Sequence, residues 1–134
     1  MAKSSGIGMT VTIDDADGTG RAITNDITNI TFNTTRGVQD VTGLNSTALE
    51  RLLLLIDFNC TITCVFNPAA APSMFAVLST PADNDTRTVV IVVGGKTMTA
   101  ECHMTDVAWS RNQDGSFTAQ ATFVQSSTTA AAWS

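Results

Sequence analysis

The sequence has no tyrosine, only 14% charged residues, and fewer basic than acidic side chains. Its formal net charge of −5 argues against a nucleic-acid groove, which normally carries a basic patch. The same charge argues against attraction to anionic membranes. The low charge does not indicate disorder, because 43% of the residues are hydrophobic. We therefore expect a single domain over residues 1–134, long enough to bury a real core.

Long apolar segments are also missing. Apolar runs such as residues 52–56 reach only five residues, far short of the roughly 20 residues that a membrane-spanning helix requires. Residues 1–8 contain one lysine and no apolar core, so no secretory signal is expected. An odd number of cysteines in such a chain predicts reduced, buried thiols at Cys60, Cys64 and Cys102. The protein is therefore expected to act without export or membrane insertion.

Side chains for catalysis or metal binding are sparse. His103 is the only histidine, and its neighbour Cys102 is expected on the opposite face of a strand. Cys60 and Cys64 would lie about 13 Å apart along an extended strand, too far for a disulfide bond. The acidic segment 14–20 lacks the spacing of a calcium-binding loop and is expected to be a turn. No phosphate-binding loop or nucleophile elbow is present, so we expect no enzyme activity, no cofactor and no metal site.

Alternation of apolar and polar residues predicts an antiparallel β protein rich in strand-forming threonine, valine and isoleucine. Strands are expected over residues 9–13, 27–33, 58–66, 87–93, 96–104, 106–111 and 116–124. Two glycine turns fix the register: Gly94 and Gly95 predict a two-residue hairpin turn, and Gly115 predicts a three-residue loop in which this glycine is left-handed. The expected opposite pairs are Val93–Lys96, Ile91–Met98, Val89–Ala100, Asn112–Ser116, Trp109–Ala119 and Val107–Ala121.

Between the strands, residues 67–81 predict one α-helix and residues 34–46 predict a long loop. A capping-box pattern predicts a short helical turn that begins at Ala48. An N-terminal arm (residues 1–8) and a C-terminal tail (residues 126–134) have no core pattern. Together these elements predict a mainly β fold, an antiparallel β-sandwich or barrel with one flanking α-helix.

The run of five apolar residues at 52–56 exceeds what one face of a strand can bury in its own core. A strand that is apolar on both faces suits a protein that buries one face on its own core and the other on a neighbour. The sequence therefore predicts contacts between copies of the chain near this run.

The segment 23–67 resembles the major tail tube proteins of long-tailed, siphovirus-type bacteriophages that infect actinobacteria. The most specific part of the resemblance is RGVQDVTGLNSTALERLLLL at residues 36–55, and the likeness continues through PSMFAVLSTP and TRTVVIVVGGK to the last predicted hairpin. The resemblance implies a β-sandwich with one helix, six copies in a ring, and rings stacked into a tube.

The same resemblance implies a structural protein of the virion tail, assembled in the host cytoplasm. Genomic DNA would pass through the tube into the host as non-specific cargo, and the acidic charge suits a channel that must not hold phosphate. The implied partners are other copies of the chain, the tape measure protein, the tail terminator and the distal tail protein. Neither an enzymatic activity nor a cofactor is implied.

Under this hypothesis we expect subunit contacts at eight residues: Arg36, Asp40, Asn45, Glu50, Arg51, Leu53, Leu55 and Trp133. The alternative for the charged residues is a solvated loop with a local ion pair worth at most about 1 kcal/mol. The alternative function is a monomeric or decorating immunoglobulin-like β-sandwich that acts as a binding module. That alternative explains the alternating strands and glycine turns, but it explains the segment 34–46 and the run 52–56 less well.

Overall fold

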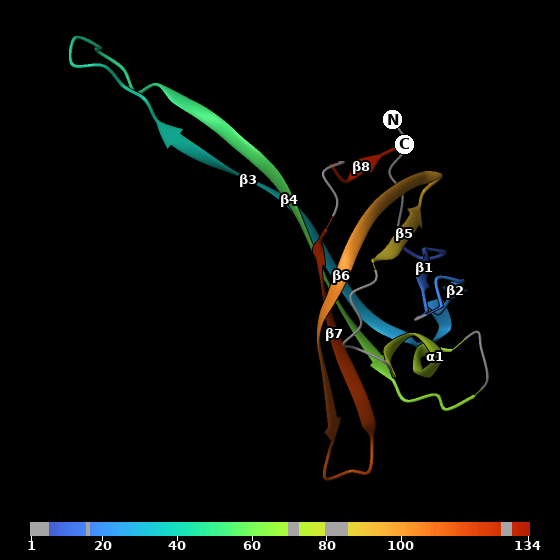
Figure 1. The fold of residues 1–134 in the computed structure, drawn as a ribbon. Coiled ribbons are helices and arrows are strands. Elements are labelled where there is room, and N and C mark those ends of the chain that lie inside the picture. Colours follow the sequence, from blue (N-terminus) through green and yellow to red (C-terminus); the bar gives the residue numbers. More distant parts are fainter. Residues whose placement is uncertain (1–5, 16, 70–72, 80–85, 127–129) are drawn as a thin grey trace.

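Eight strands, one short α-helix and one 3-10 segment make up the described part of the computed structural model, which covers residues 6–15, 17–69, 73–79, 86–126 and 130–134 (Figure 1). The strands are β1 (Thr10–Asp14), β2 (Gly20–Ala22), β3 (Ile27–Asp40), β4 (Arg51–Val65), β5 (Arg87–Val93), β6 (Lys96–Arg111), β7 (Phe117–Gln125) and β8 (Ala132–Trp133). The helical elements are α1 (Met74–Leu78) and the 3-10 segment η1 (Thr24–Asp26). All strands join one antiparallel sheet in the order β2-β1-β5-β6-β7-β4-β3, and β8 pairs with β6 beside this path. The predicted fold class, mainly antiparallel β with one α-helix, is confirmed.

Both predicted glycine turns are present. Gly94 and Gly95 have φ values of 59° and 79°, the left-handed conformation that a two-residue hairpin turn requires. Gly115 has a φ of 95°, and the amide of Asn112 donates to the carbonyl of Ser116 at 2.8 Å, which closes the second hairpin. The strand pairs are those expected: Val93–Lys96, Ile91–Met98, Val89–Ala100, Trp109–Ala119 and Val107–Ala121.

Strand β6 is one continuous strand, although the sequence predicted two. Residues 96–102 of this strand pair with β5, and residues 102–111 pair with β7. The pairing with β7 continues through an irregularity between Met104 and Asp106, so the strand does not end there. The C-terminal strand β8 pairs with residues 98 and 99 of β6, which have no partner in β7. The short strands β2 and β8 were not predicted, because two or three residues carry no readable alternation.

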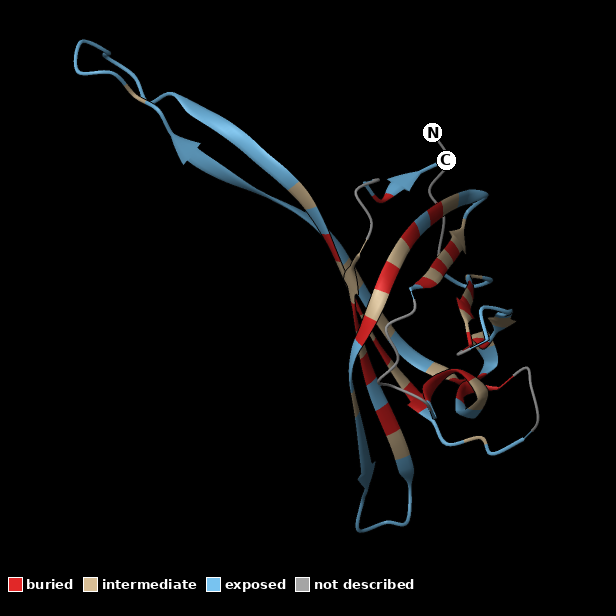
Figure 2. Ribbon diagram, viewed as in Figure 1, coloured by how far each residue is buried: buried red, intermediate tan, exposed pale blue. Residues whose placement is uncertain are grey.

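The core lies on the inner face of the rolled sheet, where buried residues from β1, β4, β5, β6, β7 and α1 form one cluster (Figure 2). The three cysteines are part of it: Cys60, Cys64 and Cys102 are buried and free, as the sequence predicted. Burial disfavours the charged thiolate and raises the pKa of each of these thiols to about 12. They are packing residues and not reactive ones.

Helix α1 is much shorter than the predicted helix over residues 67–81, of which residues 70–72 and 80–81 lie outside the described part. The buried carboxylate of Asp26 explains the late start. It accepts the side-chain amide of Asn67 at 3.0 Å and the backbone amide of Met74 at 2.9 Å, which holds residues 67–69 away from helical geometry. At the other end, the buried guanidinium of Arg87 donates to the carbonyl of Val77 at 2.6 Å and fixes α1 to β5.

The acidic segment after β1 is a turn, as predicted. One carboxylate oxygen of Asp15 accepts the amides of Asp17 and Thr19, both at 3.0 Å, and Gly18 is left-handed with a φ of 84°. The other oxygen pairs with Arg21 at 3.0 Å. The bonds from Thr19 and then Arg21 hold the pKa of Asp15 below its usual value.

The loop predicted over residues 34–46 is confirmed only for residues 41–46, since residues 34–40 belong to a strand, and the helical turn predicted at Ala48 is wrong. Strand β3 continues to Asp40, and β4 already begins at Arg51, so the two form a long two-stranded ribbon that projects from the body (Figure 1). We call residues 33–56 the arm, and this name does not include the N-terminal residues 1–8. The polar segment 34–40 carries no alternating apolar residues, and it is extended because its backbone pairs with β4.

Candidate functional site

The arm exposes the apolar run that the sequence singled out. Every residue from 33 to 55 is exposed except Thr42, which is half-buried (Figure 2). A two-stranded ribbon has no layer behind it, so alternation sends the leucines of the run to both of its faces without burying either set. Leu53 is 61% exposed and Leu55 is 90% exposed. The excess of apolar side chains inferred from sequence is therefore an exposed apolar surface.

A bulge bends the middle of the arm. Arg36 opposes Ile56 and Val38 opposes Leu53, so two residues of β4 stand against Gly37 alone. The Nε atom of Arg36 donates to the carbonyl of Leu54 at 2.9 Å across this bulge. A Cβ atom on Gly37 would lie 3.1 Å from the Leu54 side chain, so the glycine allows the two strands to approach closely here.

The far end of the arm is closed by a network around Thr42, a residue that sequence reasoning missed. The carboxylate of Asp40 accepts the Thr42 amide at 2.9 Å and its hydroxyl at 2.6 Å, which lowers the pKa of Asp40. The Thr42 hydroxyl accepts the amide of Glu50 at 2.8 Å. Asn45 lies in the exposed connection beyond this network. An Asp-x-Thr pattern is a typical signal for such a turn, and it was available in the sequence.

Arg36 and Arg51, the two arginines of the arm, form no ion pair with a carboxylate among the described residues. Arg51 stands opposite Asp40 in the ribbon. Neither Arg36 nor Arg51 has a carboxylate within ion-pair distance among the described residues. The local ion pair considered as the alternative from sequence is therefore not formed within the described part of the chain.

Seven of the eight predicted contact residues lie on the arm, and Trp133 lies apart from them. It belongs to β8, opposite Met98 of β6, and its ring centroid is 5.8 Å from that of Phe32. The amide of Ser134 donates to the carbonyl of Thr97 at 2.8 Å, which holds this end of the chain against the sheet. Trp133 thus has an anchoring contact within its own subunit, and half of its surface remains exposed.

A second exposed apolar surface was not predicted. Four of the eight aromatic residues of the chain gather beside the end of the β6–β7 hairpin, and each is 36% to 41% exposed. We call them the aromatic cluster: Phe66, Phe75, Trp109 and Phe117.

Phe66 is the centre of this cluster, with its ring centroid 5.0 Å from Phe117, 6.1 Å from Phe75 and 6.2 Å from Trp109. The rings of Trp109 and Phe117 are stacked 5.7 Å apart. Sequence alternation paired Trp109 with Ala119 correctly. It could not reveal that the sheet continues here beyond the core.

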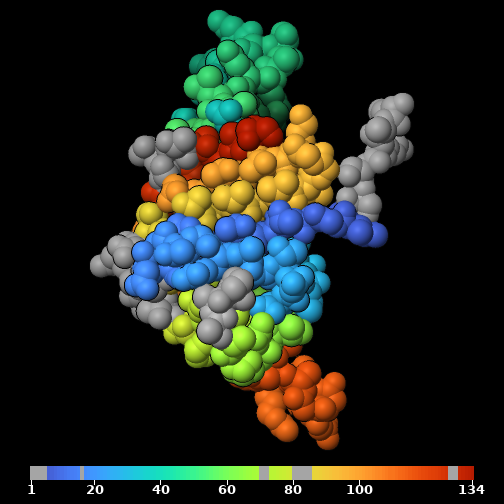
Figure 3. Space-filling model, turned by 90° about the vertical axis from the view of Figure 1, so that its right-hand side faces the viewer, coloured from blue at the N-terminus to red at the C-terminus, as the bar shows by residue number. Residues whose placement is uncertain are grey.

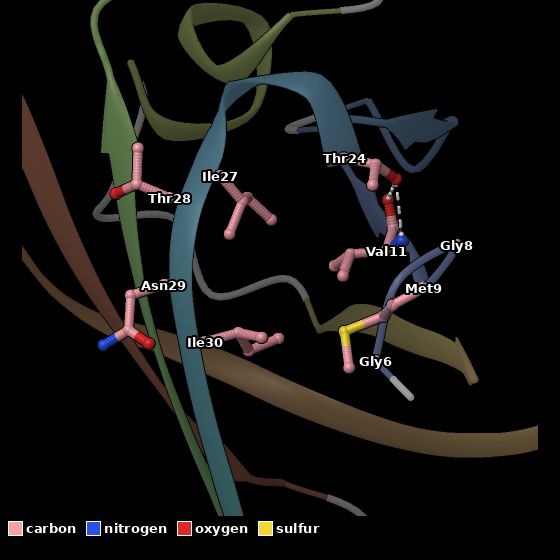
Figure 4. Close-up of a pocket in the computed structure, with 9 residues that line it drawn as sticks. All are labelled: Gly6, Gly8, Met9, Val11, Thr24, Ile27, Thr28, Asn29 and Ile30. Atoms are coloured by element: carbon pink, nitrogen blue, oxygen red, sulfur yellow. Dashed lines mark hydrogen bonds between the residues drawn. The ribbon is translucent and has the colours of Figure 1, made fainter. Parts of the chain in front are cut away.

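The pocket between β1 and β3 has a different character (Figure 4). It has a volume of about 330 Å³ and lies where the rolled sheet does not close on itself. Met9, Ile27 and Ile30 point into it, whereas Thr28 and Asn29 point away. Among the described residues that line it, none is titratable.

Metal-binding side chains do not converge in the described ranges. Within them, no group of three or more histidine, cysteine, aspartate or glutamate residues is arranged to hold a metal ion. A search of the same ranges finds no helix long and apolar enough to span a membrane.

The described residues form a rolled antiparallel sheet with one short helix and a projecting hairpin, and this fold is shared with chains of phage-like tail particles. The chain is similar, at 14% identity and a TM-score of 0.74, to one in the structure "Tail of empty GTA particle computed with helical refinement, C6 symmetry", with coverage of 98% of this chain and 99% of that one. A chain of the "Virion of native gene transfer agent (GTA) particle" gives a TM-score of 0.71 at 14% identity, with the same coverage. A chain of the six-fold symmetrised anti-feeding prophage (AFP) baseplate gives 0.61 at 9% identity, covering 100% of this chain and 95% of that one.

No protein-family model and no curated protein matches the sequence. At these identities the likeness establishes the fold, and nearly the whole of each chain takes part in it.

Proposed function

We propose that the protein is a structural subunit of a phage-like tail, in which six copies form a ring and rings stack into a tube that conducts genomic DNA. The observation that carries the proposal is the arm, a ribbon of exposed leucines that has no use in an isolated domain. The similarity to chains of particles with six-fold tail or baseplate symmetry supports the same conclusion.

The arm needs a partner for physical reasons. A two-stranded hairpin without a packed face is marginally stable in water, and an exposed apolar surface favours association. Contact with a neighbouring subunit would remove the leucines from water and order the ribbon. We infer that the arm joins neighbouring copies, with Arg36, Asp40, Asn45, Glu50 and Arg51 at or beside the contact.

The free edge of the sheet supports assembly as well. Strand β3 is the last strand in the sheet order, so one side of its backbone has no strand partner among the described residues. A closed ring of subunits removes such edges, which are otherwise sites of uncontrolled pairing. A head-to-tail contact gives a ring where its rotation closes and an open stack where it does not, so two such contacts in one chain would give stacked rings.

Transit of DNA is compatible with the charge of the chain. With a net charge of −5, a tube of many copies repels phosphate over its surface and does not hold the cargo. Other tail proteins, the tape measure, the terminator and the distal tail protein, are the expected partners along the tube and at its ends, and the virion tail is the expected location.

The test is the oligomeric state of the purified protein, followed by light scattering on a sizing column and by negative-stain electron microscopy over a range of concentrations. Rings or tubes are expected. A protein that stays monomeric at every concentration, even with tail-initiating proteins added, would contradict the proposal and favour the immunoglobulin-like binding module.

The arginines are tested in the same assay. Arg36→Ala and Arg51→Ala are expected to weaken assembly. The control is Lys96→Ala, which removes an exposed basic side chain from the β5–β6 hairpin. Normal assembly of both arm variants would remove these residues from the contact and leave the rest of the proposal standing.

A further inference from the structure

The arm and the aromatic cluster are exposed apolar surfaces of the described part of the molecule, and they lie at opposite ends. In Figures 1 and 3 the arm projects from one end of the body and the β6–β7 hairpin projects from the other. The aromatic cluster lies beside this second end, since Trp109 and Phe117 flank the hairpin loop on β6 and β7. Such a separation prevents the arm of a subunit from covering its own aromatic cluster.

We propose that the aromatic cluster is the docking surface for the arm of a second copy of this chain. The inference rests on the proposed function and adds the surface that receives the arm. Because donor and acceptor lie at opposite ends, each docked copy presents a new free arm and a new free cluster. The contact is therefore heterologous and repeats in one direction, as a stack of subunits requires.

The two surfaces are chemically complementary. The leucines of the arm offer flexible aliphatic side chains, and the cluster offers four rings with exposed faces and edges. Arg36 and Arg51 flank these leucines without a carboxylate partner among the described residues, and aromatic faces attract guanidinium groups. The arm would thus place both its apolar and its cationic groups on a surface that suits them.

The area indicates how such a contact would behave. Four aromatic side chains of roughly 150–250 Å² each, exposed by about two fifths, leave on the order of 200–400 Å² of ring surface to cover. With a similar area from the arm, one contact buries less than the roughly 1,200 Å² of a stable pairwise interface. A single contact is therefore weak, whereas several made together between two rings reinforce one another. We expect cooperative assembly without a stable dimer intermediate.

Cross-linking tests the contact directly. We would join Gln39→Cys, on the arm beside Leu52, to Arg111→Cys, which stands opposite Phe117 at the rim of the cluster. Neither change removes apolar surface. The native cysteines are buried and remain unreactive towards a short bis-maleimide, so adducts report only on the introduced thiols. Mixed assemblies of the two single variants, one carrying a size tag, are expected to give the arm–cluster adduct as the main product.

A double-mutant cycle provides the second measurement. Leu53→Ser and Phe117→Ser are each expected to raise the critical concentration for assembly at least tenfold, and the double variant by clearly less than the product, because the two residues share one contact. Urea unfolding of each variant shows that the subunit is still folded.

The outcomes separate this inference from the function on which it rests. Assemblies that give only arm–arm adducts, or that form normally with Phe117→Ser, overturn the docking surface and leave a self-assembling subunit. A protein that never assembles overturns both.

Discussion

Replacing Leu53 and Leu55 together by serine separates assembly from folding. Both residues lie on the arm, with 61% and 90% of their surface exposed, and no core side chain depends on them. Surface changes of this kind usually alter the free energy of unfolding by less than about 0.5 kcal/mol. In the assembly, the same side chains would lose their contact with a neighbour.

The size of the effect follows from the exposed fractions. Fully burying one leucine side chain contributes about 1.5–3 kcal/mol, and the two exposed fractions together equal about one and a half leucines. The double substitution therefore removes roughly 2–4.5 kcal/mol per contact, which lowers the association constant by about two to three orders of magnitude.

The assay combines sedimentation velocity and negative-stain microscopy with urea denaturation monitored by fluorescence. The variant is expected to be monomeric where the parent assembles, with an unchanged unfolding midpoint. Gln39→Ser is the matched control, because it changes the same ribbon without removing apolar surface. Leu78→Ser, in the core, is expected to lose folding. Normal assembly of the double variant would refute the assignment of the arm as a contact surface.

Three further predictions concern the subunit alone. Asp26→Ala leaves the buried amide of Met74 without its acceptor, so we expect a loss of about 3 kcal/mol in the free energy of unfolding, measured in urea. The three cysteines are expected to resist iodoacetamide at pH 8 until the protein is unfolded, as mass spectrometry would show; modification of the folded protein would contradict their burial. The pKa of Asp15 is lower in the folded chain than the 3.8 of a free aspartate, so its stabilising effect is present above that pH and is lost as the pH falls through the folded value. Thermal melts of Asp15→Asn are therefore expected to depend less on pH below about 4 than those of the parent, and an unchanged dependence would contradict this role.

The parts of the fold that could be predicted from the sequence are those whose conformation is fixed by neighbouring residues. Left-handed glycines at Gly94 and Gly115 dictate their turns, and once a turn is fixed the alternation of its flanking strands leaves one register. These features need only a few neighbouring residues to be read correctly.

The predictions that were wrong concern segments whose structure depends on residues far away in the sequence. Residues 34–40 form a strand only because β4 runs beside them, and their own sequence has the glycine and polar side chains of a loop. The late start of α1 depends on Asp26, far away in the sequence, which binds Asn67 and the first helical amide. Alternation likewise paired Trp109 with Ala119 correctly but contains no information about where the covering layer ends. For the same reason the aromatic cluster had no sequence signal.

The change of partner along β6 has a consequence for the order in which the chain folds. Strands β5, β6 and β7 form two consecutive hairpins within residues 87–125, so their closure costs little chain entropy. The pairings of β1 with β5 and of β4 with β7 join remote segments and close much longer loops. We expect this three-strand meander to form in the transition state, so that Gly95→Ala, at a φ of 79°, slows refolding in stopped-flow measurements. Arm substitutions are expected to leave the refolding rate unchanged, because the arm lies outside the pairings of this meander.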